Sequence, residues 1–111
     1  MTHIVIEISE RIERVSVKGH TGFAQAGEDI VCAGISSITF AAGMALQRYQ
    51  IPVKIFQNEE TTEFVIVPKW SQMSEEQKLR TETILHTLQW ALEDLADSYR
   101  EYVSIDILRR C

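Results

Sequence analysis

Residues 29–50 read DIVCAGISSITFAAGMALQRYQ, and this stretch decides the fold. Asp29 is a favourable N-cap and Pro52 stops a helix, so we expect a helix from Ile30 to Gln50. Apolar residues occur nearly all round this helix, which is typical of a helix buried on more than one side. It therefore needs other elements to pack against, and the rest of the chain should supply them.

Two strands are predicted before this helix. Ile4, Ile6 and Ile8 alternate with other residues, a period-two pattern that indicates a strand. After a short turn at Glu10–Arg11, a less regular alternation from residues 12 to 18 predicts an antiparallel partner strand. Together they form the first hairpin of an expected sheet.

A second hairpin is predicted after Pro52. Val53 and Ile55 begin one strand, and the run Thr61 to Val67 forms the other, with the turn at Asn58-Glu59-Glu60. Pro68 should end the second strand because proline has no backbone N–H to donate.

A second helix is predicted from Glu75 to about Arg100, because Ser74 and Gln77 form a capping-box pattern. The stripe that we expect to face the core is Leu85, Leu88, Leu92, Leu95 and Tyr99. The residues that we expect in solvent are Glu82, Gln89, Glu93 and Asp97. A last strand is predicted at residues 102–107, where apolar and polar residues again alternate.

The predicted order is strand, strand, helix, strand, strand, helix, strand. This order indicates an α+β fold: a single two-layer domain over residues 1–111, with a mostly antiparallel sheet packed by two helices. A length of 111 residues suits one domain with a modest core.

The composition and charge of the chain argue against several classes of function. The net charge of −5 argues against direct nucleic-acid binding through a broad basic face. No apolar run is expected to approach the roughly 20 residues of a membrane span, and the N-terminus has no secretion-signal pattern. Cys32 and Cys111 are therefore interpreted as free thiols in a reducing compartment, and we expect a cytoplasmic protein without a membrane partner.

The candidate site combines a cysteine with a glycine-flanked histidine. If Asp29 is the N-cap, Cys32 is the third helical residue, where the helix dipole favours the reactive thiolate. The dipole contributes only about 0.3–1 kcal/mol at an exposed site. An imidazolium about 4 Å away adds about 4 kcal/mol at an effective dielectric near 20. His20, in the loop Gly19-His20-Thr21-Gly22, is the candidate, and Cys-His pairs activate thiols for acyl transfer.

Two more polar residues share a helix face with Cys32. Asp29, Cys32 and Ser36 are spaced i, i+3 and i+7. Asp29 either caps the helix or orients His20, and the sequence leaves both roles open. Ser36 either hydrogen-bonds within the site or bonds the carbonyl one turn back.

The same residue types also occur in other kinds of site. A lone cysteine near a buried helix is more often a small core residue. A glycine-rich loop before a helix also suggests phosphate binding, but Gly19-His20-Thr21-Gly22 matches no phosphate-loop pattern and carries no lysine. A metal site is not expected, because His20 and Cys32 lack a second close pair of ligands.

The paired motif resembles one known family. Gly19-His20-Thr21-Gly22, followed by Gly-Glu-Asp-Ile-Val-Cys-Ala-Gly-Ile-Ser at residues 27–36, is similar to the ribosomal-processing cysteine proteases called Prp. The family has Gly-His-x-Gly and then Gly-x-Asp-Ile-Val-Cys-Ala-Ala-x-Ser. The resemblance covers essentially the whole chain, and Gly34 departs from the usual alanine.

The resemblance implies a cysteine endopeptidase that removes a short N-terminal extension from a large-subunit ribosomal protein precursor. It implies Cys32 as nucleophile, His20 as base, and Asp29 and Ser36 in supporting roles. It also implies a substrate-covering loop containing Gly19, Gly22 and Gly27, a homodimer, and a need for neither metal nor cofactor.

Two alternatives differ in class. One is a non-catalytic ribosome-associated binding module of the same fold, although an intact His20 and Cys32 speak against it. The other is a different thiol enzyme, such as a thioesterase or a redox protein. A redox role normally needs a nearby resolving cysteine, and Cys111 is the only candidate.

Overall fold

The computed structural model describes residues 1–19 and 26–110. In chain order the elements are β1 (Thr2–Ser9), β2 (Arg11–Lys18), α1 (Ala26–Arg48), β3 (Val53–Asn58), β4 (Glu63–Pro68), a short 3₁₀ helix (Trp70–Gln72), α2 (Glu75–Ser98) and β5 (Val103–Arg109). The predicted order of strands and helices is confirmed.

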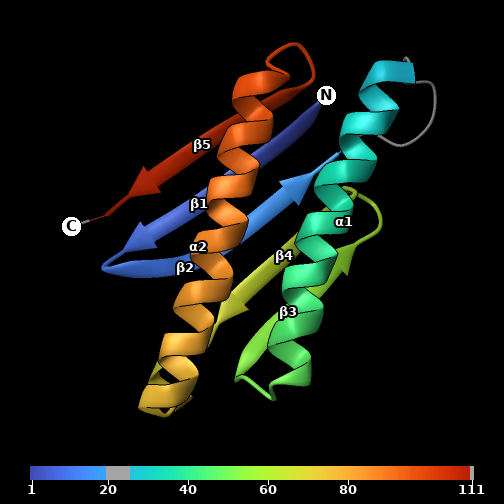
Figure 1. Ribbon diagram of the computed structural model, residues 1–111. Helices are drawn as coiled ribbons and strands as arrows, with labels where there is room; N and C mark the ends of the chain where they lie inside the picture. Colours follow the sequence, from blue (N-terminus) through green and yellow to red (C-terminus); the bar gives the residue numbers. More distant parts are fainter. Residues whose placement is uncertain (20–25, 111) are drawn as a thin grey trace.

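The five strands form one sheet in the order β3-β4-β2-β1-β5. All neighbouring strands are antiparallel except β1 and β5, which are parallel. Figure 1 shows α1 and α2 side by side on the same face of this sheet. The predicted two-layer α+β architecture with a mostly antiparallel sheet is therefore confirmed.

The core lies between the sheet and the two helices. Ile4 and Ile6 of β1, Ile35 of α1 and Leu92 of α2 are all fully buried. Each such side chain contributes about 1.5–3 kcal/mol relative to an exposed position. The alternation in β1 therefore marks the side of the sheet that the helices cover.

A bulge explains the irregular alternation of β2. The pairing of β1 with β2 shifts after Glu7 and leaves Glu13 without an opposite residue on β1. An extra residue reverses which face the following side chains point to. Ile12 and Val15 consequently both lie in the core, although they are three residues apart.

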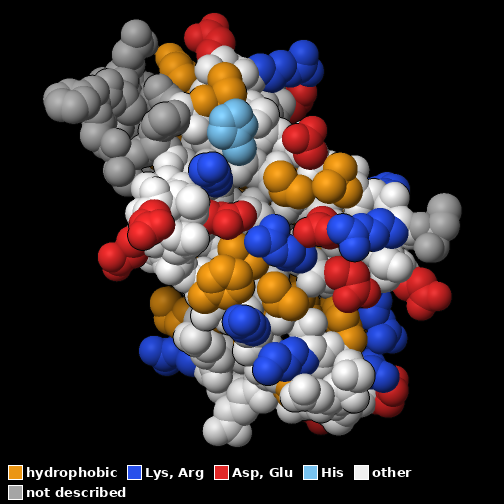
Figure 2. All heavy atoms as spheres, turned by 180° about the vertical axis from the view of Figure 1, so that it is seen from behind, with side chains coloured by type: hydrophobic (Ala, Val, Ile, Leu, Met, Phe, Trp, Pro, Cys, Tyr) orange, Lys and Arg blue, Asp and Glu red, His pale blue; other side chains and the backbone are white. Residues whose placement is uncertain are grey.

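The other face of the sheet carries no helix, and Figure 2 shows charged and apolar side chains interspersed over this side of the molecule. Arg14 is placed between two carboxylates, with guanidinium nitrogens 3.7 Å from an oxygen of Glu7 and 3.5 Å from one of Glu63. These partly exposed ion pairs contribute little to stability, about 0–1 kcal/mol each.

The start of α1 differs from the prediction. The helix begins at Ala26, four residues before the expected first residue, Ile30. Asp29 is therefore inside the first turn, and the prediction that it is the N-cap is wrong. An acidic residue is favourable at either place, because both lie near the positive end of the helix dipole.

The end of α1 also comes earlier, at Arg48 instead of Gln50. Gln50 has a left-handed backbone, with φ of 57°. The N–H of Ile51 bonds the carbonyl of Leu46 at 2.9 Å, and that of Gln50 bonds Gln47 at 3.0 Å. This is a Schellman motif, which satisfies the last carbonyls of the helix.

By length and composition alone, residues Ile30–Arg48 of α1 would suffice to cross a membrane, with a mean hydropathy of 1.6. The expectation that no apolar run approaches that length is therefore wrong. In the fold, the inner side of this segment packs in the core through Val31, Ile35 and Leu46. The segment is thus a core helix that is also apolar on its outer side.

The capping box of α2 is confirmed. The Gln77 N–H donates to Ser74 Oγ at 3.1 Å, and the Ser74 N–H donates to Gln77 Oε1 at 2.9 Å. The helix ends at Ser98, so Tyr99 falls outside it and is 44% exposed instead of lying in the core. Gln89 is buried, against the prediction, and its amide donates to Glu93 at 2.8 Å.

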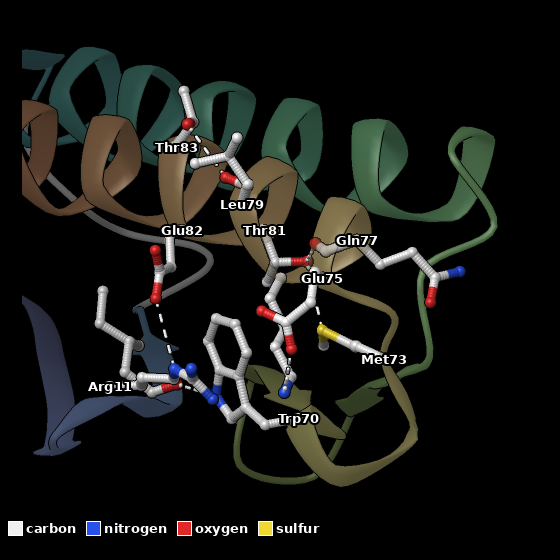
Figure 3. A network of polar contacts seen from close by, with 11 residues as sticks. Arg11, Trp70, Met73, Glu75, Gln77, Leu79, Thr81, Glu82 and Thr83 are labelled. Carbon is white, nitrogen blue, oxygen red and sulfur yellow. Dashed lines mark hydrogen bonds and ion pairs between the residues drawn. The ribbon is translucent and has the colours of Figure 1, made fainter.

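A polar network ties the beginning of α2 to the first hairpin (Figure 3). The Trp70 indole N–H donates to the carbonyl of Ile12 at 2.9 Å. Arg11 lies over the Trp70 ring at 5.1 Å and pairs with Glu82 at 3.3 Å. The loop before α2 is thereby fixed to the turn between β1 and β2.

Candidate active site

A cleft of about 380 Å³ opens between α1, the end of β2 and the β3–β4 hairpin. Its wall on α1 consists of Cys32, Ala33, Ser36, Thr39 and Phe40. The sheet and its turns contribute Thr2, Val17, Gly19, Gln57, Glu59, Thr62 and Phe64. The cleft therefore contains two of the predicted supporting or catalytic side chains, Cys32 and Ser36, together with residues that the sequence analysis did not single out.

Cys32 is a free, half-buried cysteine on the cleft side of α1. Its Sγ lies 2.6 Å from Oγ1 of Thr2, the first residue of β1, and either atom is able to donate the hydrogen bond. The thiol thus borders the cleft instead of being sealed in the core. This excludes the interpretation of Cys32 as a purely structural core residue without access to a cavity.

The helix position of Cys32 differs from the prediction. Because α1 begins at Ala26, Cys32 is its seventh residue. Only the first four N–H groups of a helix lack a partner within the helix. Cys32 therefore lies beyond the first turn, where the effect of the helix dipole is concentrated, and the prediction that the dipole at the third helical position favours its thiolate is wrong.

Ser36 and Thr39 continue the cleft face of α1. With Cys32 they are spaced i, i+4 and i+7, which places all three on one side of the helix. Thr39 is buried and donates to the carbonyl of Ile35 at 2.7 Å. The predicted proximity of Cys32 and Ser36 is confirmed. The side chain of Asp29 lies outside the described part of the chain.

His20 and Gly22 lie outside the described residues, so the predicted Cys32–His20 pairing stays a prediction. Gly27 is in the first turn of α1, so the prediction that it belongs to the loop is wrong.

Gly19 marks where the His20 loop leaves β2. A Cβ added to Gly19 would lie 3.6 Å from Thr2 Oγ1 and 3.7 Å from Cys32 Sγ. Any side chain at this position would therefore touch both the Thr2 hydroxyl and the Cys32 thiol.

The base of the loop is fastened to the β3–β4 turn. The Gly19 N–H donates to the carbonyl of Thr62 at 3.4 Å, and the Thr62 hydroxyl donates back to the carbonyl of Gly19. Thr62 has a positive φ of 54°, which turns it toward Gly19. The hairpin that lines one side of the cleft thus also holds the starting point of the histidine loop.

The floor of the cleft is aromatic. The rings of Phe40 and Phe64 meet edge to face, with centroids 4.8 Å apart. Such pairs contribute about 0.5–1.5 kcal/mol beyond their buried area. Glu59 brings a carboxylate to the rim of the same cleft.

Sequence reasoning missed Thr2 and Thr62. A signal for Thr2 existed, because it has the same strand parity as Ile4 and Ile6 and therefore faces the helices. No local signal marks Thr62, since its contact with Gly19 depends on how two hairpins pair.

Within the described residues, 1–19 and 26–110, no group of three His, Cys, Asp or Glu side chains lies close enough together to hold a metal ion.

At the end of α2, a hydrogen bond to Asp97 raises the pKa of the exposed Arg100. This pair is not part of the cleft lining.

Comparison with known proteins identifies the fold and the family. The family model described as "Cysteine protease Prp" matches residues 1–104. The chain belongs to the Prp family. The ribosomal processing cysteine protease Prp of Mycoplasma pneumoniae is 29% identical over 106 residues, which are 96% of this chain and 98% of that protein. The predicted enzyme class, a cysteine protease, is thereby confirmed.

Solved structures show the same fold. The S. aureus Prp protease in complex with a substrate peptide has a TM-score of 0.81 at 21% identity, covering 96% of this chain and 99% of that one. SMU.848 from Streptococcus mutans has a TM-score of 0.83 at 20% identity, covering 99% and 96%. The α+β architecture described above is thus that of the Prp fold.

Proposed function

We propose that this protein is an endopeptidase that removes the N-terminal extension of a large-subunit ribosomal protein, using Cys32 as nucleophile and His20 as base. One observation carries the proposal. The Cys32 sulfur borders a cleft that Gly19, the residue before His20, also lines, and a Cβ added to Gly19 would lie 3.7 Å from that sulfur. Membership of the Prp family supports the same reaction class.

The chemistry follows from a cysteine–histidine pair. The Cys32 thiolate attacks the carbonyl carbon of the scissile peptide and forms a tetrahedral intermediate. His20, as imidazolium, protonates the leaving amine when the C–N bond breaks, which leaves an acyl-enzyme. Neutral His20 then takes a proton from water, and the resulting attack on the thioester releases the new carboxylate and restores the thiol.

Supporting roles are proposed for Asp29 and Ser36. Ser36 lines the cleft one turn after Cys32, which supports a hydrogen bond from its hydroxyl to the substrate. Asp29 precedes Cys32 by three residues, on the same side of α1. Because it is not the N-cap, orienting His20 is the role that remains of the two considered.

The substrate proposal rests on relatives and on charge. The M. pneumoniae relative is named a ribosomal processing protease, and the S. aureus Prp structures include one with a substrate peptide and one with a covalently linked product peptide. Here the cleft rim carries Glu59, and the chain has a net charge of −5. Ribosomal proteins are generally basic, so long-range attraction favours the encounter.

The test is incubation with a synthetic peptide that spans the extension junction of the ribosomal protein precursor, with mass detection of the cut. Wild type should cleave it, whereas Cys32→Ala and His20→Ala should lose cleavage by about a thousandfold or more. Cys111→Ala is the matched control, and its activity should equal that of wild type. Cleavage that survives in Cys32→Ala would contradict the proposal.

The assembly and compartment are also proposals. We propose a cytoplasmic homodimer that needs no metal or cofactor and binds neither membrane nor nucleic acid directly. Exposed apolar side chains on the outer side of α1, Ile30 and Met44, support self-association, because they are 73% and 50% exposed. A monomeric mass in light scattering at micromolar concentration would contradict the dimer, and loss of cleavage in EDTA would contradict metal independence.

A further inference from the structure

Thr2 is a buried polar residue at the edge of the catalytic cleft. Its side chain is 1% exposed, and its Oγ1 lies 2.6 Å from Cys32 Sγ. The two residues are 30 positions apart in the chain, and the fold brings the first residue of β1 against α1. A buried hydroxyl needs a hydrogen-bond partner, and here that partner is the sulfur.

The position of this hydroxyl is fixed by the sheet. The Thr2 N–H donates to the carbonyl of Tyr102 at 2.8 Å, and Thr2 pairs with Val103 at the start of the parallel β1–β5 ladder. Threonine is β-branched, which restricts the rotation of its side chain. Thr2 is therefore a rigid anchor, whereas an isolated cysteine side chain has several accessible rotamers.

We propose that Thr2 is a positioning residue for the nucleophile: its hydroxyl holds Cys32 Sγ in the orientation that faces the cleft. The proposal rests on the proposed function of Cys32. In the resting thiol, the S–H donates to Thr2 Oγ1. When the sulfur has given its proton to the base, the Thr2 O–H rotates and donates to the thiolate. The two atoms therefore stay hydrogen-bonded, with donor and acceptor exchanged.

The surroundings of the sulfur agree with this role. A Cβ added to Gly19 would touch the same two atoms, so glycine avoids a side-chain contact with the sulfur at this position. Among the described residues, Thr2 thus contacts the sulfur from the sheet side. A hydrogen bond that involves a charged sulfur is stronger than a neutral one, so the contact matters most in the reactive state.

The experiment compares Thr2→Val, which keeps the shape and removes the hydroxyl, with Thr2→Ser, which keeps the hydroxyl. Thr2→Val should lower kcat for the junction peptide about tenfold or more, with KM within about twofold of wild type. The alkylation rate of Cys32 by iodoacetamide at fixed pH should fall in Thr2→Val. Thr2→Ser should restore most of both rates.

Controls separate a structural effect from positioning. Thr87→Val makes the same chemical change on the exposed side of α2 and should leave cleavage and alkylation unchanged. Thr2→Ala is a second variant without the hydroxyl, in case the valine side chain disturbs packing. Thermal unfolding of each variant shows that the compared proteins are folded.

Two results would overturn the proposal. One is kcat and alkylation within twofold of wild type in both Thr2→Val and Thr2→Ala. The other is a Thr2→Ser variant as impaired as Thr2→Val, which would assign the effect to the methyl group. Alkylation needs no substrate, so it tests Thr2 even if wild type fails to cleave the ribosomal peptide and the proposed function is wrong.

Discussion

The two helices lie side by side on one sheet but divide their surfaces differently (Figure 1). α2 has one buried stripe, built on Leu85, Leu88 and Leu92, and a mainly polar outer side. Its start is held by the Ser74 capping box. Nearly all of its side chains therefore either stabilise the core or face water.

α1 has three sides instead of two. Val31 and Ile35 pack in the core, Cys32 borders the cleft, and Ile30 and Met44 are exposed apolar residues. α2 also has exposed apolar residues, Leu79 and Trp90, so the feature that distinguishes α1 is its cleft side. α2 thus contributes mainly to stability, whereas α1 contributes to stability and also lines the cleft.

The largest expected effect tests the stabilising role of α2. Leu92 is fully buried, so Leu92→Ala should lower the free energy of unfolding by about 2–5 kcal/mol. Leu79→Ala on the same helix is the control, because Leu79 is 64% exposed and its truncation should change stability by at most about 0.5 kcal/mol. Urea unfolding measures both. Equal losses would mean that α2 does not pack through the Leu92 side.

The next effect concerns the cleft side of α1. Ser36→Ala removes a hydroxyl from the cleft wall and should lower kcat/KM by about 2–10-fold, the equivalent of one net hydrogen bond. Its neighbour Ser37 is exposed, so Ser37→Ala is the matched control and should keep full activity. Peptide cleavage measures the ratio. If both variants lose the same activity, the cleft side of α1 is wrongly assigned.

A smaller change in stability should follow from the cap of α2. Ser74→Ala removes the acceptor for the Gln77 N–H and should cost about 1 kcal/mol, seen as a lower Tm. Ser71→Ala, in the preceding 3₁₀ helix, removes an exposed serine and should leave Tm nearly unchanged. A Tm unaffected by Ser74→Ala would show that the tertiary network at Trp70 holds the helix start without the cap.

The same contrast between the helices explains what the sequence could predict. The start of α2 was predicted to the residue, because a capping box is a local pattern that only one helix start satisfies. The start of α1 was misplaced by four residues, because an aspartate suits both the N-cap and the first turn. With the start at Ile30, Cys32 would be the third helical residue, but it is the seventh. The predicted effect of the helix dipole on its thiolate depends on the earlier position.

Local sequence patterns do not predict which residues from distant segments of the chain come into contact. Helical spacing places Cys32 and Ser36 on one side of α1, whereas the contact of Thr2 with Cys32 joins residues 30 positions apart. Thr62 meets Gly19 only because β2 pairs with β4. The polarity of Gln89 alone predicts that it is exposed. In the structure its amide donates a hydrogen bond to Glu93, and this partner allows the side chain to be buried.

The smallest effect has the opposite sign and lies on α1. Gly34 is inside the helix, and a Cβ built there meets no atom within 4 Å, so Gly34→Ala should raise the free energy of unfolding by about 0.5–1 kcal/mol. Gly43→Ala is the comparison, because its Cβ would touch Phe64 at 3.6 Å and Ile55 at 3.5 Å, ordinary contact distances. Urea unfolding should therefore give gains of similar size at both positions. A loss at Gly34 with a gain at Gly43 would mean that a second body, such as a partner subunit or the loop that carries His20, occupies the open side of α1 beside Cys32.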